Sequence, residues 1–235
     1  MHLECDTREA NLKVNDVRFG GILNMEIYLV RHAIKEKTIG DVPLTKEGVK
    51  QAQLIAKYFK SIPLSSIFSS PLRRAQETAE YTARMHDLSV RIDNRLRERA
   101  NWGDLPDQTF QEFVELWDRC TKDPDFVPPV GDSARRACER ISSLLYELAA
   151  GHTSESRILI VTHGGLITDY LANTFQENVL NRFHPQFIIE QSNLIPECSI
   201  TKLRYDNKSF SIEQFAYTEH LETMEVGHGT SIRDI

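Results

Sequence analysis

Two short apolar segments, each followed within two residues by a histidine, constrain the fold of this chain most. Residues 27–30 (Ile-Tyr-Leu-Val) precede His32, and residues 158–161 (Ile-Leu-Ile-Val) precede His163. Runs that are rich in β-branched residues and too short for helices predict strands buried on both faces, as in a parallel sheet. Open α/β sheets bind their ligands at the carboxyl ends of such strands. If these two strands are neighbours, His32 and His163 lie together at that edge.

Strand and helix signals alternate along the rest of the chain. Thr45, Ser70 and Ser133 are predicted N-caps, with Pro71 in the first turn after Ser70 and Gly151 as a helix stop. The predicted elements are strands at 25–30, 66–69, 88–92 and 157–161, helices at 45–60, 70–86, about 107–121, 133–150 and 165–175, and a hairpin of 199–205 with 209–215. This order predicts an α/β domain whose mostly parallel sheet carries an antiparallel edge strand.

The 235 residues are enough for one good-sized core and do not require a second domain. Residues 1–24 are polar and precede the first strand, so they are interpreted as an N-terminal extension. The domain is expected at 25–220, followed by a tail at 221–235. Residues 101–132, which combine a helix with a proline-rich loop, are interpreted as a lid insertion and are called the lid segment below.

Composition excludes several classes of partner. The formal net charge of -6 and the pI of about 5.8 give no basic footprint for nucleic acid. No apolar stretch is long enough for a membrane span, and residues 1–24 lack the apolar core of a signal peptide. The four cysteines match neither a zinc pattern nor a secreted disulfide scaffold, so a cytoplasmic location is expected.

The residues around the two histidines suit a phosphoryl group. Arg31 precedes His32, and Arg74 lies one turn into the helix that follows the second strand. Guanidinium groups match phosphate oxygens in a bidentate way, and a neutral imidazole whose other nitrogen donates to a backbone carbonyl can attack phosphorus. Glu98, just past the third strand, is placed to protonate the leaving alkoxide. Arg73 is interpreted as a solvated neighbour of Arg74.

Four ordered motifs carry a resemblance to a known family. They are Arg31-His32-Ala33, Ser69-Ser70-Pro71-Leu72-Arg73-Arg74-Ala75, Leu96-Arg97-Glu98 and Thr162-His163-Gly164-Gly165. Over about 25–220 the chain resembles the histidine phosphatase superfamily, the phosphoglycerate mutase-like proteins. The resemblance implies a three-layer α/β/α fold and no metal or other cofactor. It also implies that His32 is the phosphorylated nucleophile, Glu98 is the proton donor, and Arg31, Arg74 and His163 bind the phosphate, with His163 also catalytic.

Three departures from the family pattern favour hydrolysis over mutase activity. Ala33 replaces the usual glycine, and residues 34–37 (Ile-Lys-Glu-Lys) replace an asparagine and small polar residues. The lid segment holds Arg119 and Lys122 but no adjacent basic pair for a second anionic group. We therefore expect a phosphomonoesterase acting on a small phosphorylated substrate. A phosphoglycerate mutase and a non-catalytic phospho-ligand binding module are the alternatives; the alcohol half of the substrate and the oligomeric state stay open.

Aromatic side chains of the lid segment have two interpretations. Trp102, Phe110, Phe113 and Trp117 could line a substrate mouth. An apolar stripe at helical spacing is more often part of a core, so Phe113 and Trp117 are expected to be core residues.

Overall fold

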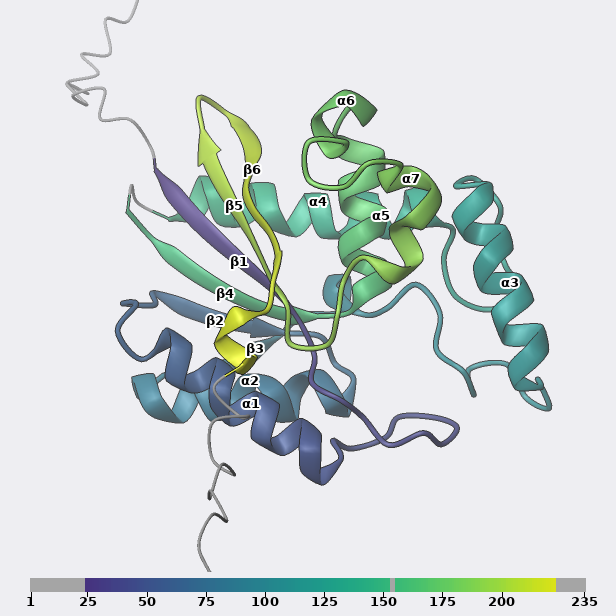
Figure 1. Ribbon diagram of the computed structural model, residues 1–235, viewed down its shortest axis with the longest axis horizontal. Helices are drawn as coiled ribbons and strands as arrows, with labels where there is room; N and C mark the ends of the chain where they lie inside the picture. The colour runs from purple at the N-terminus through teal and green to yellow at the C-terminus, as the bar shows by residue number, and fades with distance from the viewer. Residues whose placement is uncertain (1–23, 153–154, 223–235) are drawn as a thin grey trace, which may run out of the picture.

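A computed structural model describes residues 24–152 and 155–222, which form one layered α/β domain (Figure 1). The sheet in this part of the chain has the order β3-β2-β4-β1-β5-β6. Its strands are β1 Met25–Arg31, β2 Ser66–Ser69, β3 Val90–Ile92, β4 Arg157–Thr162, β5 Ile200–Asp206 and β6 Ser209–Tyr217. The first four strands are mutually parallel, whereas β5 is antiparallel to β1 and β6 is antiparallel to β5. The predicted mixed sheet with an antiparallel edge is confirmed.

Helices cover both faces of the sheet. They are α1 Lys46–Phe59, α2 Arg73–His86, α3 Phe110–Lys122, α4 Ala134–Gly151, α5 Gly164–Thr174, α6 Glu177–Leu180 and α7 Phe187–Glu190, with short 3-10 turns at Asn94–Leu96 and Gln191–Asn193. Alternate residues of β1 enter two separate cores, because successive side chains of a strand point to opposite faces. Ile27 and Leu29 pack with α4 and α5, whereas Tyr28 and Val30 pack with α1 and α2. The three-layer α/β/α arrangement is thus confirmed.

The central strand pair fixes the position of both histidines. β1 and β4 are parallel neighbours, with Arg31 opposite Thr162. His32 and His163 follow these two residues at the carboxyl edge, where the backbone N–H of His32 donates to the carbonyl of Thr162 at 2.9 Å. The loop after β2 reaches the same edge, since the N–H of Ser70 donates to the carbonyl of Val161 at 3.0 Å. The expected meeting of the two strand ends is confirmed.

Two of the three predicted N-caps are confirmed. The hydroxyl of Thr45 accepts from the N–H of Gly48 at the start of α1, and Ser133 caps α4 through the N–H of Arg136. The prediction that Gly151 stops its helix from outside is wrong, because Gly151 is the last residue of α4. It adopts no positive φ, which is the conformation that favours glycine beyond a helix end.

The third N-cap prediction is wrong in an informative way. Helix α2 begins at Arg73 with Leu72 as its N-cap, two residues later than expected. The hydroxyl of Ser70 accepts from the N–H of Leu72 at 3.3 Å and forms a 2.7 Å hydrogen bond with Nε2 of His163. A long-range partner at the sheet edge thus replaces the local capping role of Ser70.

The peripheral segments frame this core. The predicted extension 1–24 and tail 221–235 lie outside the described residues, apart from Asn24, Leu221 and Glu222. In the lid segment, α3 lies at the side of the domain, away from the sheet (Figure 1). Within the described ranges, no helix has the length and apolar character that crossing a membrane requires.

Candidate active site

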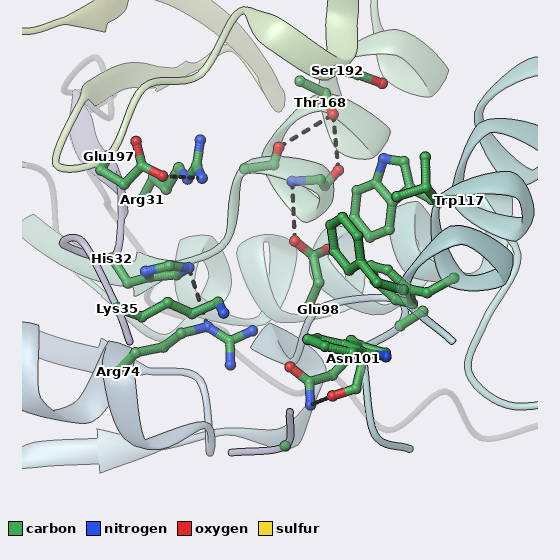
Figure 2. A pocket seen from close by; sticks show the side chains of 18 of the residues that line it. Arg31, His32, Lys35, Arg74, Glu98, Asn101, Trp117, Thr168, Ser192 and Glu197 are labelled. Carbon is green, nitrogen blue, oxygen red and sulfur yellow. Dashed lines mark hydrogen bonds and ion pairs between the residues drawn. The ribbon is translucent and has the colours of Figure 1, made fainter. Parts of the chain in front are cut away.

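The predicted site residues converge at the carboxyl edge of β1, β2 and β4 (Figure 2). The ring centroids of His32 and His163 are 5.2 Å apart, with an interplanar angle of 64°. Arg74 donates from Nε to Nε2 of His32 at 3.2 Å. Glu98 lines the same pocket together with Arg31, His32 and Arg74. Residues from four distant parts of the chain therefore surround one small volume.

His32 is held in an orientation that suits nucleophilic attack. Nδ1 lies 2.8 Å from the carbonyl oxygen of Ala33, so Nδ1–H donates there and Nε2 carries the lone pair. Burial and the neighbouring Arg74 hold the pKa of His32 well below its ordinary value of 6.5. The imidazole is therefore neutral at pH 7. The methyl group of Ala33, where the family has glycine, is buried in the core beside α1 and α2 and does not crowd the pocket.

Adjacent arginines of α2 have opposite environments. Arg74 is 3% exposed and reaches His32, whereas the side chain of Arg73 is 58% exposed and pairs with Glu77 at 2.7 Å. Nη1 of Arg74 is buried and has no hydrogen-bond partner among the described residues. Buried donors in folded proteins are nearly always paired, so an oxyanion at this point would complete the site.

His163 presents a second neutral imidazole. Its Nε2 is engaged by Ser70, while its buried Nδ1 has no partner within the described ranges. Burial, followed by the charge of Arg74, lowers the pKa of His163 well below 6.5. Ser70 is a site residue that the sequence interpretation missed, because its motif position was fully explained by a helix cap.

Glu98 is oriented by two backbone donors. Its Oε2 accepts from the N–H of Gly165 at 3.1 Å and its Oε1 from the N–H of Arg99 at 3.0 Å. The side chain is nearly buried, and in Figure 2 it lies between His32 and Trp117. A carboxyl group fixed in the pocket that His32 lines can exchange a proton with a substrate oxygen.

Arg31 and Lys35 complete the cationic end of the pocket. Arg31 donates to the carbonyl of Ile195 and to Glu197, each at 2.5 Å. Lys35 lines the pocket, and burial together with Arg74 and Arg31 lowers the pKa of its ammonium group. The sequence interpretation used Lys35 only as a departure from the mutase pattern. Its position three residues after His32, on the loop leaving the strand, is the signal that could have identified it.

Aromatic side chains of the lid segment line the other end of the pocket, whose volume is about 330 Å³. Trp102, Phe110, Phe113 and Trp117 all contribute, as one of the two interpretations anticipated. The expectation that Phe113 and Trp117 are core residues is wrong, since neither is fully buried. The reason is that α3 lies away from the sheet (Figure 1), and the apolar side chains of its stripe line the pocket instead of packing in a second layer.

Because His32 and His163 are neutral in the folded protein, we expect its free energy of unfolding to depend on pH. Folded-state pKa values below 6.5 mean that the unfolded chain binds protons that the native state does not, so stability falls as pH drops below 6.5. Each histidine contributes a slope of about 1.4 kcal/mol per pH unit until its folded pKa is reached. Between pH 7 and pH 5, the free energy of unfolding of the wild type, measured with denaturant, should fall by about 2 kcal/mol more than that of His163→Gln.

The comparison with His163→Gln cancels titrations that the two proteins share, including that of Asp169, whose pKa is raised by burial. Identical pH profiles for the two proteins would contradict a neutral buried His163.

A match to a family model identifies the superfamily of the chain. The model of the histidine phosphatase superfamily, branch 1, matches residues 27–218, so the chain belongs to that superfamily. The chain is 30% identical over 213 residues to phosphoglycerate mutase-like protein 4 of Arabidopsis thaliana, covering 84% of this chain and 87% of the relative. It is 32% identical over 195 residues to a probable phosphoglycerate mutase of Proteus mirabilis, covering 78% and 86%.

Solved structures share the fold. A mycobacterial glucosyl-3-phosphoglycerate phosphatase superposes with a TM-score of 0.64 and 24% identity, covering 83% of this chain and 100% of that one. A phosphoserine phosphatase from Entamoeba histolytica, in complex with 3-phosphoglyceric acid, gives a TM-score of 0.65 at 24% identity, covering 84% and 99%. Both results agree with the layered α/β architecture.

Proposed function

We propose that this protein is a metal-independent phosphomonoesterase that hydrolyses a small phosphate ester through a phosphohistidine on His32. The observation that carries the proposal is the state of His32: a neutral ring whose Nδ1–H is fixed by Ala33 and whose Nε2 meets Arg74. A nucleophile in this form needs no separate base to remove a proton before attack.

In the first step, the Nε2 lone pair of His32 attacks phosphorus as the bond from phosphorus to the ester oxygen breaks. Glu98 gives its proton to the departing oxygen, so the product leaves as an alcohol. Arg74, Arg31 and His163 stabilise the charge on the phosphoryl oxygens. Two N–H groups of Arg31 bond to Ile195 and Glu197, and others of its planar fork can donate to phosphate.

In the second step, water attacks the phosphohistidine and the bond between Nε2 and phosphorus breaks. The carboxylate of Glu98 takes a proton from that water, which restores the acid for the next cycle. Inorganic phosphate leaves and His32 returns to its neutral form. The pocket is not a closed cavity, so water can enter it.

Product identity separates hydrolysis from transfer. The names of the two relatives above keep mutase-type phosphoryl transfer as the alternative. The test is rapid acid-free quenching of enzyme mixed with labelled ester, followed by tandem mass spectrometry and phosphate analysis. We expect phosphate on His32 and a stoichiometric release of inorganic phosphate. An isomerised ester without phosphate release would establish the mutase, and label on another residue would contradict the proposed nucleophile.

Chelation is expected to leave turnover unchanged, because the proposed steps use only side chains of this chain. The measurement is the initial rate with and without excess chelator after dialysis. Inhibition that added metal ions reverse would contradict a metal-independent reaction.

Removal of Arg74 should impair phosphate binding. Hydrogen bonds to charged groups contribute about 1.5–3 kcal/mol, so Arg74→Ala should weaken competitive inhibition by inorganic phosphate by roughly 10- to 150-fold. Arg73→Ala is the matched control, since Arg73 lies one residue earlier on α2 and pairs with Glu77 at the surface. The reverse pattern would mean that Arg73 binds the phosphate.

A further inference from the structure

The lid segment presents an aromatic surface next to the reacting groups. We propose, on the basis of the function proposed above, that the alcohol half of the substrate carries a flat apolar group and no second anionic group. Trp102, Phe110, Phe113 and Trp117 form the surface that receives this group, and they are called the aromatic wall below.

The wall is continuous. The ring centroids of Trp102 and Phe110 are 5.1 Å apart, those of Phe110 and Phe113 are 6.4 Å apart, and those of Phe113 and Trp117 are 5.9 Å apart. These separations are typical of interacting aromatic pairs. A planar group entering the pocket therefore meets a row of rings that already pack on one another.

The ends of the wall are fixed by bonds outside the pocket. The indole N–H of Trp102 donates to the carbonyl of Gln108 at 3.1 Å. The guanidinium of Arg99 lies 4.0 Å from the centroid of Trp117 and is anchored by the buried Asp169 at 2.5 Å. One face of the Trp117 ring is thus covered by Arg99, which holds the ring in position. The rest of the ring gives the pocket an apolar surface that is in place before a ligand binds.

The wall begins where the leaving oxygen would receive its proton. A methyl group added at Gly165 would meet the ring of Trp117 at 2.3 Å and Oε1 of Glu98 at 2.8 Å. The proposed acid and the first ring therefore border the same point. Figure 2 shows Glu98 beside Trp117, so an alcohol whose oxygen is at Glu98 can extend its carbon skeleton along Trp117 and the next rings.

Charge in the pocket is concentrated at the phosphate end. The charged lining residues in the described part of the chain are Arg31, Lys35, Arg74, Glu98 and Glu197. Arg31 and Arg74 are assigned to the phosphate, and Figure 2 shows Lys35 beside Arg74. A second carboxylate or phosphate on the alcohol half would instead face ring surfaces, whose π-systems are negative. The pocket therefore disfavours phosphoglycerates.

Phe110 is the residue of the aromatic wall whose exposed apolar surface a ligand would cover most. It is 57% exposed although it lines the pocket, so a bound apolar group would cover surface that now contacts water. Covering such surface and stacking on the ring each stabilise a complex by an amount comparable to a tenfold change in affinity. Phe110 is also exposed enough for its removal to leave the core intact.

The test uses esters whose alcohols have similar acidity, so that leaving-group chemistry does not bias the result. We expect kcat/KM for 2-phenylethyl phosphate to exceed that for ethyl phosphate by about 10- to 100-fold, and 3-phosphoglycerate to be poorer than either. In Phe110→Ala the ratio of the two kcat/KM values should fall by about tenfold. Tyr146→Ala, which removes a half-exposed aromatic residue on α4 outside the pocket, should keep the wild-type ratio.

Non-hydrolysable phosphonates extend the test to binding alone. 2-Phenylethylphosphonate should bind the wild type more tightly than ethylphosphonate by a similar factor, and Phe110→Ala should reduce the difference. Equal affinities, or a ratio unaffected by Phe110→Ala, would overturn the aromatic wall as the substrate site while phosphohistidine formation on His32 persists. Tight selective binding of the phenyl compound without any phosphohistidine would instead overturn the proposed reaction and leave the wall as a binding site.

Discussion

Replacing His32 with alanine is expected to lower kcat/KM for every phosphate ester by at least about 10,000-fold, the scale on which removal of a covalent nucleophile acts. The physical reason is that the other neutral imidazole of the site, that of His163, does not occupy the place of His32 Nε2. His163 is 5.2 Å away between centroids, and its Nε2 is already bonded to Ser70. Steady-state kinetics and phosphoenzyme trapping measure the loss.

The control for this variant is phosphate binding. Arg31 and Arg74 remain in His32→Ala, so inorganic phosphate should still bind within about tenfold of the wild-type affinity by calorimetry. His163→Ala provides the second comparison, because it should slow the reaction yet still accumulate phosphate on His32. Near wild-type turnover by His32→Ala would contradict the proposed nucleophile, as would label on His163.

Replacing Glu98 with glutamine is expected to slow alkyl phosphates by about 100- to 10,000-fold, the usual range for general acid catalysis. Glutamine keeps the shape of the side chain and one acceptor oxygen for the N–H of Gly165 or Arg99, but it has no proton to give to an alkoxide. The parameter to measure is kcat/KM, because it reports the steps up to departure of the alcohol.

An ester with a good leaving group supplies the internal control for Glu98→Gln. Nitrophenolate departs without protonation, so 4-nitrophenyl phosphate should lose much less activity than ethyl phosphate. Equal losses for the two esters would indicate that Glu98 positions the substrate or the lid segment and does not donate a proton.

Sequence patterns were sufficient for the layered fold because each depends on residues close together in the chain. The apolar runs before His32 and His163 identified the central strands. Thr45 and Ser133 identified helix starts, because the hydroxyl of each accepts a hydrogen bond from the backbone N–H three residues later. The choice of Arg74 over Arg73 depended on the place of Arg74 before Ala75, which matches the family pattern. Where a local rule met a stronger distant partner, as at Ser70, the prediction was wrong.

The sequence by itself determined the alternation of strands and helices, the order of the four motifs, and the residue types that suit phosphoryl chemistry. Only the tertiary structure decided how those residues are used. In the folded protein, Ser70 forms a hydrogen bond with His163, which lies 93 positions later in the sequence. Arg31 pairs with Glu197, which lies 166 positions later. The tertiary structure also turned the aromatic stripe of α3 toward the pocket. Periodicity tells which side of a helix is apolar, but packing alone decides what that side faces.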